Sequence, residues 1–393
     1  MARMAVDDKD LRAARKKNKR QKRIKNYIIV LVILLIGFVC FLLRGYWVPK
    51  LKGLFEKPHG LIVNDGTLAA GNFPITLSDN GSTSLFVSED MFVSVDDSAI
   101  KFFDINGEQQ KLIQHTMAHP AACVCDDKML IYENGGNSFE LLGFKGEIYT
   151  KKLDENILLA SMKGDTVAIV TSTDKYDACL TVYNNEGSVI YKWSANKRIM
   201  SVDIFEDGSG CLVSTFSSNN GVVSSTVTEL DFSSEGAAMT SGELDTLVLG
   251  AYKNASNDIW AVGDTAIYRI DDKGNILSTT EYNGELCAFD ANDRLCAVAC
   301  SGVARGSSRL MIFNSDDKEI TGDVSIDSGK VKALCCDDEN VFMLSEHSAE
   351  CYDLGANLTA TAAVSNDYVD FVHMKESLIF VGYRDINKIE FKN

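Results

Sequence analysis

A short hairpin pattern recurs along most of the chain and constrains the fold more than any other feature. Two runs of alternating apolar and polar residues flank a turn that is rich in acidic residues and glycine. The pattern occurs in IKFFDINGEQQKLIQ (100–114), FELLGFKGEIYTKKL (139–153), LTVYNNEGSVIYKWS (180–194), IYRIDDKGNILSTTEY (267–282) and CYDLGANLTATAAV (351–364). Such alternation around glycine-containing turns is typical of antiparallel β-strands.

The hairpins recur at a regular spacing. Each interval divides into four short strands; in residues 330–364 they are VKALCCDD, NVFMLSEHS, AECYDLG and NLTATAAV. Periods of about 40–50 residues with four strands are typical of β-propeller blades. The turn positions are 37 to 49 residues apart, at Gly107, Gly146, Gly187, Gly236 and Gly274, near Lys318 and at Gly355. We therefore predict an all-β propeller.

The number of repeats predicts eight blades, with seven as the alternative. Three strands near the C-terminus, YVDFVHMK, SLIFVGYR and NKIEFKN, form an incomplete last module. The segment GNFPITLSD, residues 71–79, is expected to complete it, because an open terminal blade would expose a sheet edge. The predicted propeller then spans 71–393. Seven complete modules precede the last one, near 84–116, 120–153, 157–194, 199–240, 247–282, 285–324 and 330–364.

The N-terminal part of the chain differs in charge from the rest. The first 50 residues hold 13 of the 39 Lys/Arg and three of the 55 Asp/Glu, so the remainder carries a net charge of −26. The uncharged run YIIVLVILLIGFVCFLL begins at Tyr27, and with the following residues predicts a transmembrane helix over 27–48. The basic tail 1–26 is expected in the cytoplasm, at the anionic inner leaflet. Residues 49–70 would form a stalk, and the propeller would be extracellular.

Cysteines and metal-ligand patterns give few chemical signals. Most of the 11 cysteines lie in apolar runs, where a free thiol behaves as a small hydrophobe, so we expect reduced, buried thiols; a disulfide between Cys335 and Cys336 is the alternative. The pair His115 and His119 lies in a connecting loop, which gives its spacing no special meaning. The stretch DIFEDGSG, residues 203–210, lacks the closing Glu of a calcium loop. We expect neither a metal nor a cofactor.

Two hairpins carry a family resemblance. The segments NEGSVIYKW (185–193) and DDKGNILSTTEY (271–282) resemble the third-strand, turn, fourth-strand signature of quinoprotein-like and WD40-like propellers. The whole chain is similar to an uncharacterised family of single-pass, membrane-anchored β-propellers of Gram-positive anaerobes. The resemblance implies a fold and a topology, and it carries over no catalytic residue.

The absence of a catalytic motif favours a binding or scaffold module over an enzyme. The expected partner is an envelope protein, a peptide or a glycan, and not nucleic acid; the alternative is an extracellular polysaccharide hydrolase or lyase. Four cations lie in connections that lead into inner strands, and they are the candidate binding residues: His119, Lys197, Arg198 and Lys330. They would either form a positive mouth for an acidic partner or offset local acidic repulsion.

Overall fold

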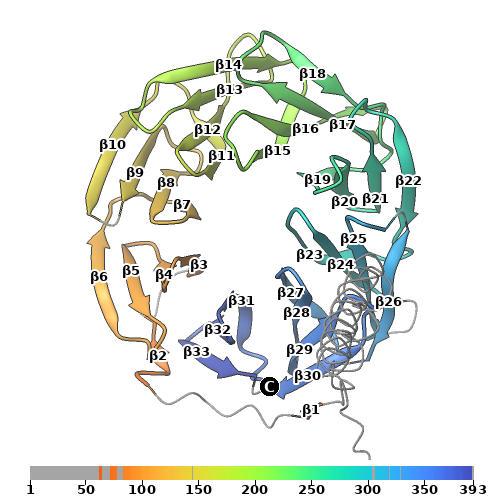
Figure 1. Ribbon diagram of the computed structural model, residues 1–393. Helices are drawn as coiled ribbons and strands as arrows, with labels where there is room; N and C mark the ends of the chain where they lie inside the picture. The colour runs from red at the N-terminus through yellow and green to blue at the C-terminus, as the bar shows by residue number, and fades with distance from the viewer. Residues whose placement is uncertain are drawn as a thin grey trace, which may run out of the picture. The chain divides into compact units, whose positions relative to one another are not determined.

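The structure, a computed structural model, is an eight-bladed β-propeller (Figure 1). It describes residues 62–63, 71–77, 83–143, 145–302, 306–317, 319–327 and 329–391. Within these ranges all regular elements are strands, and no helix could cross a membrane. The predicted tail 1–26, the predicted helix 27–48 and nearly all of the predicted stalk 49–70 lie outside the described residues. The prediction of eight blades is confirmed, and the seven-blade alternative is wrong.

Each blade contains four antiparallel strands, and the first of them lines the centre of the ring (Figure 1). Blades 1 to 4 are β3 (Ser84–Ser88), β4 (Met91–Val95), β5 (Ala99–Asp104), β6 (Gln109–Gln114); β7 (Pro120–Cys125), β8 (Lys128–Glu133), β9 (Ser138–Gly143), β10 (Gly146–Lys152); β11 (Ile157–Lys163), β12 (Thr166–Thr171), β13 (Ala178–Tyr183), β14 (Val189–Ala195); and β15 (Arg198–Ile204), β16 (Gly210–Asn219), β17 (Val222–Asp231), β18 (Ala237–Thr240).

Blades 5 to 8 continue the same order around the ring. They are β19 (Val248–Lys253), β20 (Ile259–Gly263), β21 (Ala266–Ile270), β22 (Ile276–Glu281); β23 (Leu286–Ala291), β24 (Leu295–Ser301), β25 (Ser308–Asn314), β26 (Ile320–Ile326); β27 (Val331–Cys336), β28 (Asn340–Ser345), β29 (Ser348–Asp353), β30 (Leu358–Ala363); and β31 (Tyr368–Met374), β32 (Ser377–Gly382), β33 (Asp385–Glu390), with β2 (Ile75–Thr76) as the fourth strand.

The recurring acidic-glycine turn joins the third and fourth strands of a blade. In blade 5, Asp271 Oδ1 accepts hydrogen bonds from the backbone N–H groups of Lys273 (3.0 Å) and Asn275 (2.7 Å). Gly274 adopts a φ of 85°, a conformation that glycine reaches without steric cost. A Cβ atom there would lie 2.6 Å from the carbonyl oxygen of Thr240 in blade 4. The turn therefore needs its aspartate for the backbone and its glycine for contact with the neighbouring blade.

Apolar side chains form eight core clusters, one between each pair of adjacent blades. Each blade thus buries one face against the preceding blade and one against the next. Adjacent cysteines show this alternation: Cys335 packs between blades 7 and 8, and Cys336 packs between blades 6 and 7. The ten described cysteines are free thiols, and burial raises the pKa of Cys335 to about 12.

The segment before blade 1 closes the ring. Ile75 and Thr76 of β2 pair antiparallel with Ile386 and Asp385 of β33 in blade 8. The ring of Phe73 lies 6.0 Å from that of Phe92 in blade 1, measured between centroids. The N-terminal segment therefore contributes to the core cluster between the last blade and the first.

A second short strand lies on the outer edge of blade 7. The strand β1 (Ile62–Val63) runs parallel to β30, with Ile62 opposite Ala360 and Val63 opposite Thr361. Blade 7 is consequently a five-stranded sheet.

Weakening the closing contact should destabilise the propeller as a whole. In the variant Phe73→Ala/Ile75→Ala we expect the free energy of unfolding to fall by about 3 kcal/mol, because two partly buried side chains leave the core between blades 8 and 1. Urea unfolding followed by circular dichroism measures this change. The control Leu112→Ala/Val189→Ala truncates side chains that are 46% and 49% exposed on outer strands, and should cost less than about 1 kcal/mol. An equal loss of unfolding free energy in the two variants would contradict the role of Phe73 and Ile75 in closing the ring.

Candidate functional site

The inner strands define two faces of the propeller. Every blade of the ring repeats the same order of strands from the centre outward, so the inner strands all begin at one face, here called the start face, and end at the other, the end face. A strand of seven residues such as β15 spans about 20 Å between them. Side chains at opposite ends of an inner strand therefore belong to separate surfaces.

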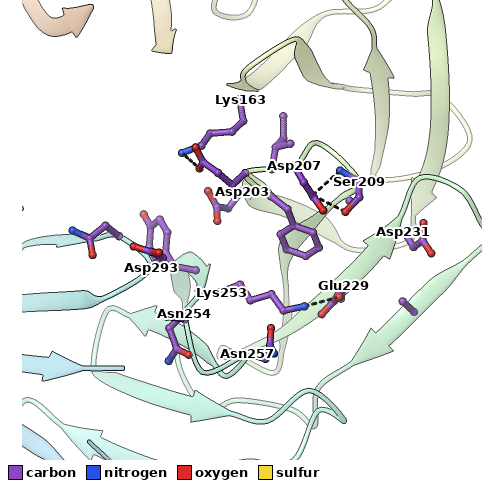
Figure 2. A pocket seen from close by; sticks show the side chains of 18 of the residues that line it. Lys163, Asp203, Asp207, Ser209, Glu229, Asp231, Lys253, Asn254, Asn257 and Asp293 are labelled. Carbon is purple, nitrogen blue, oxygen red and sulfur yellow. Dashed lines mark hydrogen bonds and ion pairs between the residues drawn. The ribbon is translucent and has the colours of Figure 1, made fainter. Parts of the chain in front are cut away.

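An open cavity of about 1180 Å³ lies at the end face, across blades 3 to 6. Lys163, Ile204, Lys253 and Ala291 line it, and they are the last residues of four successive inner strands. The turns that follow β15, β19 and β23 and residues of β17, β18 and the turn between them complete its rim. Figure 2 shows side chains from several blades gathered around this space.

Local hydrogen bonds hold the rim turns in shape. After β15, Asp207 Oδ1 accepts hydrogen bonds from the N–H (3.0 Å) and the hydroxyl (2.7 Å) of Ser209. After β19, the buried Asn254 accepts the N–H groups of Ser256 (3.0 Å) and Asp258 (3.1 Å). These turns are preformed, so a ligand would meet a fixed polar rim.

The cavity is strongly acidic. Two lysines offset part of the charge: Lys163 Nζ lies 2.6 Å from Glu206 Oε2, and Lys253 Nζ lies 3.0 Å from Glu229 Oε1. The Lys253 ammonium also lies 4.8 Å from the ring centroid of Phe205, in cation–π geometry. Six carboxylates line the same space, namely Asp203, Glu206, Asp207, Glu229, Asp231 and Asp293. The excess of four negative charges favours cationic ligands.

Two half-buried carboxyl groups lie at the level where the inner strands approach their ends. Burial raises the pKa of Asp203 to about 6, although the Lys163 ammonium acts in the opposite direction. Burial likewise raises the pKa of Asp290 to about 6. The hydrogen bond that its Oδ2 accepts from the Cys336 N–H (2.7 Å) acts in the opposite direction and lowers this pKa. Tyr252 lies in the intervening blade, and its pKa is raised by burial and then by these two carboxylates. Both aspartates therefore titrate near pH 6.

The sequence alone does not predict this cavity. Its one signal was the stretch DIFEDGSG, which supplies Asp203, Glu206 and Asp207, and which we compared with a calcium loop. Within the described ranges, no group of three His, Cys, Asp or Glu residues is arranged to hold a metal ion. The remaining acidic side chains come from other blades or strands, some 25 to 90 residues along the sequence.

The four cations named from the sequence lie at the start face. Arg198 is the first residue of β15, Lys197 precedes it, and His119 and Lys330 immediately precede β7 and β27. His119, Arg198 and Lys330 are exposed, and Lys197 is half-buried. They belong to blades 2, 4 and 7, which are not neighbours. The positive mouth stays a prediction.

Solved propellers show the same fold. BamB from Moraxella catarrhalis has 11% sequence identity and a TM-score of 0.56, with 83% of this chain and 100% of that chain covered. The C-terminal WD40 domain of Sif2 has 11% identity and a TM-score of 0.59, covering 82% of this chain and 100% of that one. The Dos1 propeller has 12% identity and a TM-score of 0.55, covering 76% and 84%. At such identities the likeness shows the fold alone.

No functionally curated protein shows a significant match to the chain. A sequence profile matches residues 74–391, from the closing segment to the last described residue. The chain belongs to DUF5711, a family of unknown function. The DUF5711 match starts at Pro74, so it includes the strand that closes the ring as well as all eight blades. The predicted likeness to WD40-like propellers is confirmed, whereas membrane anchoring and a source in Gram-positive anaerobes stay predictions.

The raised pKa values of Asp203 and Asp290 predict a pH dependence of stability. An unfolded aspartate loses its proton near pH 4, whereas the folded chain holds both protons up to about pH 6. Protonation therefore stabilises the folded state, and the free energy of unfolding should fall as the pH rises from about 4 to about 6. Solvent screens both carboxyl groups, because both are partly exposed. We therefore expect the free energy of unfolding to fall by only roughly 1–2 kcal/mol per group.

The variant Asp203→Asn/Asp290→Asn should lack this loss. Urea unfolding between pH 4.5 and 7.5 compares it with the wild type, and Asp272→Asn, which alters an exposed turn, is the control. Parallel curves for the wild type and the double variant would show that the two carboxyl groups do not titrate in this range.

Proposed function

We propose that the propeller is a protein-binding module that holds a basic segment of a partner in the end-face cavity. The observation that carries the proposal is the excess of four carboxylates over ammonium groups in an open cavity of about 1180 Å³. Lysine and arginine side chains are the cations that a protein partner supplies, and the aromatic ring of Phe205 adds cation–π affinity for them. The likeness to WD40 domains and BamB supports a scaffold built for protein contact.

The rim geometry suits an extended, flexible ligand. The cavity crosses four blades, and its carboxylates are distributed along it rather than focused on one point. A segment with several basic residues could therefore pair with Asp203, Glu206 and Asp293 in succession. Preformed turns limit the entropy that binding costs.

Charge neutralisation in the cavity should weaken this binding. For the variant Asp203→Asn/Glu206→Gln/Asp293→Asn we expect at least a tenfold higher Kd for a fluorescent decapeptide of alternating lysine and serine, measured by anisotropy at 50 mM salt. The control Asp97→Asn/Asp174→Asn/Asp367→Asn removes the same charge from exposed positions at the start face. Equal weakening in both variants would mean that only the net charge attracts the peptide, and the cavity would not be the site.

We also propose that the propeller is displayed outside the cytoplasmic membrane, as the apolar segment 27–48 and the preceding basic run predict. A membrane-impermeant lysine reagent applied to intact cells should label lysines after residue 60 and spare those of residues 1–26. Labelling of the basic tail in sealed cells would reverse the orientation. This location makes an envelope protein the expected partner.

A polysaccharide hydrolase or lyase is the second candidate function. The observation in its favour is that Asp203 and Asp290 have pKa values raised to about 6, which suits a general acid. An enzyme would lose nearly all turnover in Asp203→Asn, whereas a binding module would lose only affinity.

A further inference from the structure

A second cavity, of about 350 Å³, lies between blades 5 and 6 on the outer side of the ring. Trp260, which is 1% exposed, lines it on the side of blade 5, and Phe313 lines it on the side of blade 6. The outer strand β22 contributes only small side chains, Ser278, Thr279 and Thr280. The volume suits one aromatic side chain or a small molecule. We call this cavity the blade-5 socket; Ile267, Arg269, Asn314, Asp317, Glu319 and Ile320 complete its lining.

Sheet register shows what fills this position in other blades. In blades 1 to 7 the outer strand has a β-bulge, and the residue after it lies opposite the third strand. In chain order this residue is Lys111, Tyr149, Tyr191, Met239, Ser278, Gly322 and Ala360. Blade 5 therefore carries a serine where blades 2 and 3 carry tyrosines.

The two tyrosines fill the gap between their own blade and the next. The ring of Tyr191 lies 5.2 Å from that of Phe232 in blade 4, and its hydroxyl donates to the carbonyl of Gly236 (3.3 Å). The ring of Tyr149 packs in the same way against the turn of blade 3, where a Cβ on Gly187 would lie 3.2 Å from it. Beside Gly322 in blade 6 the turn of blade 7 approaches instead, since a Cβ there would lie 2.7 Å from the Ala356 N. Beside Ser278 in blade 5 there is neither a ring nor such a close approach, and the gap is open as the socket.

The outer edge of another blade already accepts an added strand. In blade 7 the equivalent position is Ala360, opposite Cys351 after the bulge, and it is also small. There the backbone of Ile62 in β1 pairs with Ala360 as part of a fifth strand. No strand among the described residues pairs with the outer edge of β22. An extended segment added there would lie beside Ser278, in the same row as Trp260 and Arg269.

The socket walls favour an aromatic side chain with a hydroxyl group. Arg269 Nε donates to Asp258 Oδ2 (2.6 Å), and its Nη atoms donate to the carbonyls of Ser315 and Asp317, so its guanidinium plane is fixed. A fixed guanidinium stacks well on aromatic rings. Glu319 immediately precedes β26, just as Gly236 immediately precedes β18, so acceptor atoms lie where the Tyr191 hydroxyl finds its carbonyl.

We propose that the blade-5 socket binds a tyrosine side chain of a partner protein, carried on an extended segment that pairs with the outer edge of β22 as a fifth strand. Main-chain hydrogen bonds would supply affinity, and the ring in the socket would supply specificity. The socket is separate from the acidic end-face cavity, so the proposal stands or falls independently of the function proposed above.

The test uses the full chain and the blocked heptapeptide Thr-Val-Thr-Tyr-Thr-Val-Thr, with binding followed by isothermal titration calorimetry. Replacing the central tyrosine by alanine should weaken binding at least tenfold. The variant Ser278→Tyr restores the plug of blades 2 and 3, and should weaken peptide binding at least tenfold. The control Leu277→Tyr adds the same ring at the neighbouring position, which is 53% exposed, and should change the Kd less than threefold. Thr280→Trp, which copies the indole that blade 3 carries at Trp193, is a second plug should Ser278→Tyr fail to fold.

Four outcomes would overturn the proposal. In the first, the tyrosine and alanine peptides bind equally tightly; in the second, Ser278→Tyr and Leu277→Tyr weaken binding of the tyrosine peptide equally. In the third, neither plug variant changes the Kd of the peptide, and in the fourth, no peptide binds at millimolar concentration. A further arm uses p-cresol, the tyrosine side-chain analogue. If the peptide binds no more tightly than p-cresol, the socket takes a free phenol and strand pairing is refuted. The triple substitution in the end-face cavity should leave peptide binding unchanged, which separates the two sites.

Discussion

The rest of the structure depends on closure of the ring. A four-stranded blade here is apolar on both faces, and each of the eight core clusters is shared by two blades. A blade at an open end would expose one of these faces to water, at a cost that scales with the apolar area. The contact of Phe73 and Ile75 with blades 8 and 1 removes both open ends at once. A short segment far from the cavities in sequence thereby fixes the positions of the strands that form them.

Sequence periodicity was sufficient for the architecture because its determinants are local. Alternation defines the strands, and the aspartate and glycine of turns such as 271–275 define where the chain reverses. Closure also followed from the sequence, since one segment had no partner and one blade lacked a strand. The cavities are different, because they arise only when blades are placed side by side. Nothing local to Asp203 or Lys253 indicates that they line one space with Asp293, since their distances depend on the stagger of neighbouring sheets.

The blade-5 socket illustrates the same limit from another direction. A serine at position 278 is unremarkable in an exposed strand, and only the sheet register shows that it stands where blades 2 and 3 place a tyrosine ring. The core between blades 5 and 6 tolerates the lack of a ring at Ser278, because Trp260, Tyr282 and Met311 are almost fully buried all the same. An interblade gap near the outer edge is therefore a place where a propeller can open a site at little cost to the ring.

Charge bears on which kind of partner each face could hold. The chain after residue 50 carries a net charge of −26, so a cationic partner experiences attraction from the whole domain and from the end-face cavity. An acidic partner at His119, Arg198 and Lys330 would be attracted locally and repelled by the domain at longer range. At physiological salt the field is screened beyond about 8 Å, so local groups dominate once a partner is bound, while the net charge acts mainly on the approach. For a basic partner at the end face both effects have the same sign, so the net charge of the domain would speed its approach and the carboxylates of the cavity would hold it.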